Sequence, residues 1–263
     1  MKNEYIPFSS QVKEIIPHTD TEYTFRMSFS GDVKPGQFFE VSIPKYGEAP
    51  ISVSGIGEGT VDLTIRKVGR VTNKIFEHYE GNSLLMRGPY GNGFDIEKFK
   101  GRDVVIIAGG TGLSPVKGIV DYFSQHPQDA SSTTLIAGFK SPDDILFKQD
   151  FENWEKTLHV TKTVDSAPEN YQGKTGMVTK YIPDLPIGDI SNTVFITVGP
   201  PVMIKFTIIE ILKRGIPEEN IWISHERKMC CGLGKCGHCK MDSTYICLDG
   251  PVFNYREGKN LID

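Results

Sequence analysis

The feature that most constrains this chain is the position of its cysteines. All five lie between residues 230 and 247, and the 229 residues before them contain none. Four of them follow the spacing x4, x2, x7, and these are Cys231, Cys236, Cys239 and Cys247. An x4 gap followed by an x2 gap is typical of plant-type [2Fe–2S] clusters, which are held by four thiolates. The spacing therefore predicts a small cluster-binding segment with these four metal ligands.

The residues between the cysteines favour the same interpretation. Gly232, Gly234 and Gly237 would let the backbone curl around a cluster and point N–H groups at its sulfurs. Starting the motif at Cys230 would lengthen the first gap to x5, so we expect this residue to be a surplus thiol. A Rieske centre pairs two histidines with two cysteines, so we expect His238 to be an ordinary loop residue.

Two other interpretations of the cysteines stay open. Cys236 and Cys239, two residues apart, would also suit a structural zinc ion. A set of disulfides is disfavoured by the odd number of cysteines and by an N-terminus without the apolar run of a secretory signal. No apolar run approaches the ~20 residues that cross a bilayer, so the sequence predicts a cytoplasmic protein.

The composition excludes further classes of protein. The chain has 263 residues, of which 38% are hydrophobic and 24% charged, as expected for a folded protein with one large or two ordinary domains. Its net charge is −4 and it has no block of Lys or Arg, which argues against a nucleic-acid partner. The six histidines show no metal-binding spacing.

Residues 1–98 are expected to form an antiparallel β-barrel or sandwich. Short runs of β-branched and aromatic residues alternate there with Gly and Pro. Only residues 72–79 have a helical pattern. The expected strands cover residues 23–29, 37–43, 51–54, 61–68 and 84–87.

Residues 99–225 are expected to form a doubly wound parallel sheet. Apolar runs alternate there with helix-like stretches, which is typical of α/β domains. The expected strands cover residues 104–108, 134–138, 158–164, 194–198 and 221–224, and the expected helices 115–124, 144–156 and 202–214. The spacing of Met203, Phe206, Ile209 and Leu212 in the last helix predicts that this stripe packs in the core. Residues 226–263 complete the chain as the cysteine-containing segment.

Two strand–turn–helix junctions in this α/β domain are candidate nucleotide-binding turns. The first is the glycine-rich turn from Gly109 to Pro115, whose free N–H groups would suit a pyrophosphate. The second begins with Gly199 and Pro200 after the next central strand. Both turns would lie at the carboxyl edge of one sheet, where ligands bind in open α/β folds.

The order of barrel, GGTG-x-x-P turn and GPP-x-M turn resembles the ferredoxin–NADP reductase superfamily over nearly the whole chain. Within it, residues 48–54, 234–239 and 249–255 most closely resemble the B subunit of anaerobic sulfite reductase. The CGHC form of the cysteine motif argues against the dihydroorotate dehydrogenase subunit. The resemblance implies a barrel that binds FAD, an α/β domain that binds NADH, and a C-terminal [2Fe–2S] segment.

The resemblance also carries over particular residues. The superfamily's R-x-Y-S flavin motif falls on residues 49–52, so only Ser52 is retained, as the catalytic residue near flavin N5. Arg66 and the turn 69–72 are expected to replace the missing arginine. The expected flavin site is Pro50, Ile51, Ser52, Val53, Ile65, Arg66, Lys67, Gly69, Val71 and Thr72. The expected nucleotide site is Gly110, Thr111, Gly112, Leu113, Pro115, Gly199, Pro200 and Met203.

The implied activity is electron transfer from NADH through FAD and the cluster to partner subunits that reduce sulfite to sulfide. The resemblance implies as partners a sirohaem catalytic subunit and a ferredoxin-like iron–sulfur subunit. An electron-transfer subunit of a soluble hydrogenase or of dihydroorotate dehydrogenase is the alternative. A zinc-containing, nucleotide-binding module without catalysis is a third possibility.

Overall fold

The computed structural model describes residues 3–78 and 83–261, so Tyr79, at the end of the helix predicted for 72–79, lies outside the described residues. The chain divides into two compact units. The barrel unit contains Met1–Phe94 and Glu226–Val252, and the sheet unit contains Asp95–His225 and Phe253–Asp263. The division of the chain into residues 1–98, 99–225 and 226–263 stays a prediction.

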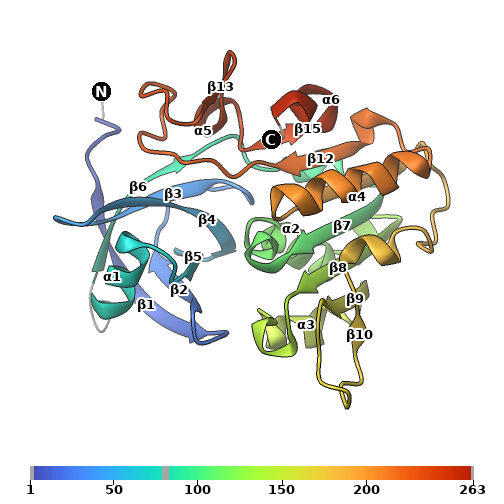
Figure 1. The fold of residues 1–263 in the computed structure, drawn as a ribbon. Coiled ribbons are helices and arrows are strands. Elements are labelled where there is room, and N and C mark those ends of the chain that lie inside the picture. The colour runs from blue at the N-terminus through green and yellow to red at the C-terminus, as the bar shows by residue number, and fades with distance from the viewer. Residues whose placement is uncertain (1–2, 79–82, 262–263) are drawn as a thin grey trace. The chain divides into compact units, whose positions relative to one another are not determined.

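Six antiparallel strands of the barrel unit close into a barrel in the order β1-β2-β5-β4-β3-β6 (Figure 1), which confirms the predicted class. The strands are β1 (Phe8–Pro17), β2 (Glu22–Ser28), β3 (Phe38–Ile43), β4 (Gly47–Gly57), β5 (Thr60–Arg66) and β6 (Ser83–Tyr90). Alternate residues turn inward, so that Phe39, Val41 and Leu63 are fully buried in one apolar core. Helix α1 (Arg70–His78) packs against β3 and β4.

The strand register places charged residues on the outer face of this barrel. On β3, Glu40 alternates with the inward-facing Phe39 and Val41, and it lies opposite Arg87 of β6. On β4, Glu48 lies opposite Ser42 of β3. Glu40 is nevertheless fully buried and Arg87 is only 4% exposed. A further segment of the same unit therefore covers this part of the barrel.

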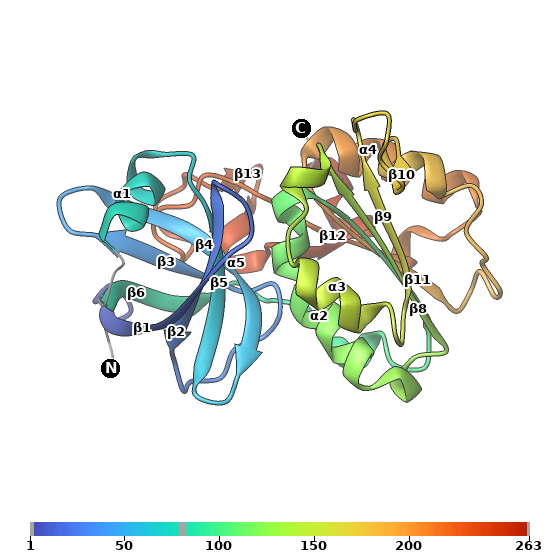
Figure 2. The same cartoon turned by 90° about the horizontal axis from the view of Figure 1, so that it is seen from below.

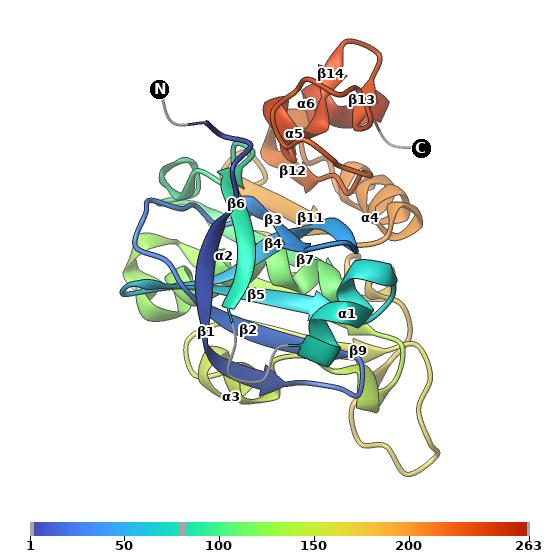
Figure 3. The same ribbon diagram turned by 90° about the vertical axis from the view of Figure 1, so that its left-hand side faces the viewer.

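The covering segment is residues 226–252, called here the cysteine segment (Figure 3). Its regular elements are β13 (Lys240–Met241), β14 (Thr244–Tyr245) and α5 (Ile246–Asp249). The amide of Asn92 donates hydrogen bonds to the carbonyls of Asp249, at 3.0 Å, and Val252, at 2.7 Å. Arg87 donates to the carbonyls of Cys230 and Cys231. Two points beside β6 thus hold the segment onto the barrel.

The sheet unit is built on a mostly parallel sheet in the order β10-β9-β8-β7-β11-β12-β15, which confirms the predicted doubly wound fold. The strands are β7 (Asp103–Gly109), β8 (Ser132–Phe139), β9 (His159–Val164), β10 (Lys174–Thr175), β11 (Thr193–Val198), β12 (Ile221–Ser224) and β15 (Val252–Asn254). Figure 2 shows α2 (Leu113–Gln125) and α3 (Lys148–Trp154) on one face and α4 (Pro201–Lys213) on the other. The strand order reverses between the parallel neighbours β7 and β11, because β8, β9 and β10 extend the sheet on one side of β7 and β11, β12 and β15 extend it on the other.

Helix α4 differs from expectation in the face that it buries. Its buried residues are Ile204, Thr207, Ile208 and Ile211. Phe206 is 55% exposed, Ile209 38% and Leu212 37%, so the stripe predicted to lie in the core is wrong. The helix carries apolar side chains on both faces, and spacing alone does not show which face meets the sheet.

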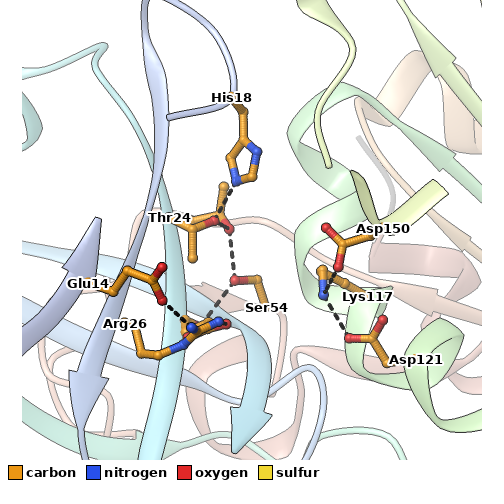
Figure 4. A network of polar contacts seen from close by, with 10 residues as sticks. Glu14, His18, Thr24, Arg26, Ser54, Lys117, Asp121 and Asp150 are labelled. Atoms are coloured by element: carbon orange, nitrogen blue, oxygen red, sulfur yellow. Dashed lines mark hydrogen bonds and ion pairs between the residues drawn. The ribbon is translucent and has the colours of Figure 1, made fainter. Parts of the chain in front are cut away.

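Partly buried charges hold α2 against α3 (Figure 4). The Lys117 ammonium lies 2.7 Å from an oxygen of Asp121 and 3.0 Å from one of Asp150. The indole of Trp154 also donates to Asp121, at 2.8 Å. Because each charge has a partner, the attraction between them offsets the cost of removing them partly from water.

The remaining short elements are α6 (Tyr255–Gly258) and the 3-10 turns Ile96–Lys98, Gly110–Gly112, Pro127–Asp129, Pro142–Asp144, Val178–Tyr181, Glu218–Asn220 and Lys259–Leu261. In the part of the chain that the structure describes, no helix has the length and apolar character needed to span a membrane.

Candidate functional site

The cysteine segment brings the four predicted ligands close together. The Cys231 thiol interacts with that of Cys236, and the Cys247 thiol interacts with those of Cys239 and Cys231. Cys231, Cys239 and Cys247 are buried, whereas Cys236 is exposed. Across residues 3–78 and 83–261, no three His, Cys, Asp or Glu side chains gather around a point that would suit one metal ion. The four thiols therefore form one connected group.

Backbone N–H groups point at these sulfurs. Leu233 and Lys235 donate to the Cys231 Sγ, each at 3.4 Å. Gly234 donates to the Cys247 Sγ at 3.2 Å. Amide donors of this kind stabilise negative charge on sulfur and tune the potential of iron–sulfur centres. The donor set therefore fits a thiolate-bound cluster.

Two glycines make this wrapping possible. Gly232 has φ +73°, and a Cβ there would lie 2.5 Å from the Tyr90 ring. Gly234 has φ +67°, and a Cβ there would lie 2.6 Å from Leu248. Neither position admits a side chain without displacing a neighbour, because the loop lies directly against its surroundings.

Two of these thiols differ in acidity. Burial raises the pKa of the Cys231 thiol, but hydrogen bonds from the N–H groups of Leu233, Lys235 and Cys236 and from the Cys236 side chain outweigh it and lower the pKa to about 6. Burial raises the pKa of Cys247 to about 12, against the opposing effect of the Gly234 N–H group. Cys231 therefore ionises for a metal more readily than Cys247, whose ionisation depends more on a bound cation.

The barrel carries the predicted flavin residues on β4, on β5 and at the start of α1. Ser52 of β4 lies opposite Phe38 and alternates with the core residues Ile51 and Val53. Arg66 ends β5, with its Nε 3.6 Å from a Glu22 oxygen and 44% of its side chain exposed. Ser52 is therefore placed outside the barrel core, and the Arg66 side chain is accessible to a ligand.

The predicted turn 69–72 begins helix α1. The Thr72 hydroxyl accepts the N–H groups of Val68, at 3.1 Å, and Gly69, at 2.9 Å. This bonding caps the helix start from its third residue. The turn is therefore a rigid loop.

A buried polar chain crosses β2, β5 and β4 close to these residues (Figure 4). The Thr24 hydroxyl lies 2.7 Å from the His18 Nε2 and 2.7 Å from the Thr64 hydroxyl. Thr64 donates to the Ser54 hydroxyl at 2.7 Å, and Ser54 donates to a backbone carbonyl. The sequence pattern did not indicate this chain, because single Ser and Thr residues in strands are common.

The two nucleotide turns meet at the carboxyl edge of β7 and β11. A Cβ on Gly112 would lie 2.7 Å from the Gly199 Cα, and one on Gly109 would lie 2.3 Å from the Met203 Sδ. Gly110 has φ +54°, and a Cβ there would have no neighbouring atom within 4 Å. Helix α2 begins at Leu113, two residues before Pro115. The edge thus offers open backbone at Gly110 and close packing at Gly112, an arrangement suited to an anion such as a pyrophosphate.

Comparison with known proteins identifies this combination of parts. The chain is 35% identical to the sulfhydrogenase 2 subunit gamma of Pyrococcus furiosus, over 96% of each chain. It is 32% identical to the probable dihydroorotate dehydrogenase B electron transfer subunit of Methanocaldococcus jannaschii, over 94% of this chain and 89% of the relative. The chain belongs to this family of electron-transfer subunits.

The domains of this electron-transfer subunit match two family models. Residues 106–208 match the oxidoreductase NAD-binding domain, and residues 226–258 match the iron–sulfur cluster binding domain of dihydroorotate dehydrogenase B. The fold resembles that of an NADH-dependent reduced ferredoxin-NADP oxidoreductase with a TM-score of 0.79, at 23% identity over 94% of this chain and 88% of that one. It also resembles a ferredoxin NADP+ reductase from Neisseria gonorrhoeae, with a TM-score of 0.68, at 19% identity over 84% and 98%.

These relatives correct two sequence-based expectations about the electron-transfer subunit. They are subunits of hydrogenase and dihydroorotate dehydrogenase, so the expected partners, a sirohaem sulfite reductase subunit and a ferredoxin-like subunit, are contradicted. The argument from CGHC against dihydroorotate dehydrogenase is also wrong, because that enzyme's iron–sulfur domain matches this segment. Short cysteine and glycine motifs report how a cofactor is held, and they carry little information about the enzyme that receives its electrons.

Sequence reasoning missed the charged residues under the cysteine segment. Arg87 and Glu40 are buried between the segment and the barrel, at 4% and 0% exposure. One indication in the sequence was that charges alternate with apolar residues in strands otherwise typical of a barrel. Their burial depends on a segment 143 residues later in the chain, as the bond from Arg87 to Cys230 shows.

Proposed function

We propose that this chain oxidises NADH and delivers the electrons, through FAD on the barrel and a [2Fe–2S] cluster, to a catalytic subunit of the hydrogenase class. The observation that carries the proposal is the loop whose backbone N–H groups donate to the sulfurs of Cys231 and Cys247, in a segment that matches an iron–sulfur cluster binding domain. Amide donors of this kind stabilise the negative charge on the sulfurs of such a cluster.

The chain's own residues contribute positioning. The backbone of Gly110, Thr111 and Gly112 binds the NADH pyrophosphate, and the second turn at Gly199 and Pro200 orients the nicotinamide. Ser52 donates a hydrogen bond near flavin N5. A bound flavin would supply a site for hydride from the nicotinamide, and a bound cluster would supply one-electron transfer to the acceptor. No protein acid or base is required for this transfer.

Arg66 and the capped start of α1 are proposed to bind the flavin's phosphate groups. Arg66 is accessible beside Glu22, and the Thr72 hydroxyl holds the turn in a fixed shape. An arginine can pair with a phosphate through two parallel hydrogen bonds. This pairing would replace the arginine that is absent at residue 49.

The hydrogenase class is favoured as the electron acceptor by the 34% and 35% identity to two sulfhydrogenase gamma subunits, each over 96% of this chain. Dihydroorotate dehydrogenase is the second candidate, supported by relatives at 28% to 32% identity. The two candidates differ in the protein that receives the electrons. Copurification of the tagged chain from its own cells separates them, because the catalytic subunit that comes with it identifies the acceptor.

Anaerobic purification tests the cofactors. We expect about two irons and two sulfides per chain, one FAD, bleaching of the flavin by NADH and an EPR signal after dithionite reduction. A colourless protein that contains zinc would overturn the proposal. Serine at Cys231, Cys236, Cys239 or Cys247 should abolish the EPR signal, whereas Cys230→Ser should preserve it.

A further inference from the structure

One guanidinium on β6 joins strand β4 to the cysteine segment. Arg87 Nε and Nη2 donate to the two Glu48 oxygens at 2.9 and 2.7 Å. Nη1 donates to the Tyr90 hydroxyl at 3.2 Å and to the carbonyl of Cys231. Nη2 also donates to the carbonyl of Cys230 at 2.6 Å. Every nitrogen of this side chain is therefore used, and two of its bonds end on the backbone at the first predicted ligand.

The partners of Arg87 leave it little freedom to move. Glu48 holds the guanidinium from β4 in the two-bond geometry that fixes both its position and its plane. The Tyr90 ring lies on the other side, with its centroid 5.5 Å from the guanidinium carbon. The same ring limits Gly232, where a Cβ would lie 2.5 Å away. The loop from Cys230 to Gly232 thus rests on a surface that Arg87 and Tyr90 form together.

The arginine also provides a buried positive charge in this region. Glu40 lies opposite it on β3, fully buried, and no hydrogen-bond partner is found for either carboxylate oxygen among the described residues. Arg87 and Cys231 both interact electrostatically with Glu40. Without the guanidinium, the Glu40 carboxylate would lie near Cys231 and the opposing charge of Arg87 would be lost.

We propose that Arg87 is the positioning residue of the cluster, because it fixes the backbone at Cys230 and Cys231 and sets the reduction potential through its charge. The inference rests on the proposed function, since it assumes a cluster at these cysteines. A positive charge beside the ligand loop favours the reduced cluster, which carries one more negative charge. The negative charge of Glu48 disfavours the reduced cluster, and it therefore lowers the reduction potential.

Four variants test this role. Arg87→Met removes the charge and both carbonyl bonds, Arg87→Lys keeps the charge but not the two-bond geometry, and Glu48→Gln removes one negative charge. Arg26→Met is the matched control, because Arg26 pairs with Asp62 at 2.9 Å on barrel strands. The readouts on anaerobically purified holoprotein are iron and sulfide content, the EPR spectrum after reduction, and the midpoint potential.

We expect Arg87→Met to lower the midpoint potential and to lose iron faster to a chelator. Glu48→Gln should raise the potential, and Arg87→Lys should retain most of the potential with an altered EPR line shape. Arg26→Met should match the wild type in all three readouts. A purely structural role would move both charge variants in the same direction, and it would overturn the inference.

A separate outcome concerns the proposed function itself. If the wild type contains zinc or no metal, that function fails before any variant is compared. If the wild type holds the cluster but the Arg87 and Glu48 variants keep its potential and spectrum, only the inference about Arg87 fails. If Arg87→Met does not fold, Arg87→Lys and Glu48→Gln still decide the question.

Discussion

At the residue scale, Glu40 shows how a single carboxyl responds to the segment that covers it. It belongs to the outward face of β3 and yet has no exposed surface. Burial raises the pKa of Glu40 to about 7, although the Arg87 charge opposes this and Glu48 adds to it. A barrel strand therefore holds an acid that changes its charge near neutral pH.

Glu40 should make the stability of the protein depend on pH. Its pKa is higher in the folded chain than in the unfolded chain, so folded protein binds the proton more tightly and stability falls as the pH rises from 4.5 to about 7. The loss should be at most roughly 3.5 kcal/mol, at ~1.4 kcal/mol per pKa unit. Urea denaturation of Glu40→Gln at pH 5 and pH 8 should show a smaller difference than the wild type. Glu14→Gln, which alters an exposed carboxyl, is the control, and equal pH dependence in wild type and Glu40→Gln would contradict the expectation.

Arg66 should contribute to flavin binding. Removing a charge-assisted phosphate contact costs about 1.5–3 kcal/mol, so Arg66→Ala should bind FAD tenfold or more weakly. Fluorescence titration of the apoflavoprotein with FAD measures the change, with Arg26→Ala as the matched arginine on β2. Equal FAD affinities in Arg66→Ala and wild type would show that another group binds the phosphates.

The cysteine ligands could be predicted from the sequence, but the residues that hold their loop in place could not. Cys231, Cys236, Cys239 and Cys247 could be chosen because ligand spacing is local, and the structure brings them close together. Arg87 could not be chosen, because its role depends on a contact with residues 143 and 144 positions further along the chain. Local chemistry is readable from spacing, whereas long-range burial requires the fold.

At the scale of elements, most strands and helices were predictable to within a few residues. The apolar run 104–108, for example, is the centre of β7 (Asp103–Gly109). Strand β1 was missed because its ten residues include Lys13 and Glu14, and only one of the ten is fully buried. Helix 144–156 is shorter than expected, since Phe147 has φ +54° and the helix begins only at Lys148.

Two glycines of the first nucleotide turn should respond differently to an added methyl group. A Cβ on Gly112 would lie 2.7 Å from the Gly199 Cα and the Val198 carbonyl oxygen, so Gly112→Ala should lower the unfolding free energy by about 1–3 kcal/mol. Gly110→Ala meets no neighbour and pays only the cost of a left-handed backbone, roughly 1 kcal/mol. Thermal denaturation with and without NADH measures both. A larger loss of stability in Gly110→Ala than in Gly112→Ala would contradict this assignment.

At the scale of the whole molecule, damage at one cofactor site should leave the other reactions intact. Cys239→Ser removes a buried ligand, so NADH should still bleach the flavin at the normal rate while reduction of a one-electron protein acceptor fails. Stopped-flow absorbance follows both steps, and Cys230→Ser should behave as the wild type in each. Normal reduction of the acceptor by the Cys239→Ser protein would mean that electrons leave from the flavin directly.

The way in which the cysteine segment rests on the barrel limits how this protein can be divided or recombined. Asn92 and Arg87 bind the two ends of the segment, and Glu40 is covered by it. A chain cut after residue 225 would therefore expose to water the charged side chains of Glu40 and Arg87, which are buried in the intact protein. Grafting the cysteines onto another flavoprotein would require transferring this surface of β3, β4 and β6 as well. The part that can be transferred between proteins is therefore the cysteine segment together with the barrel surface on which it packs.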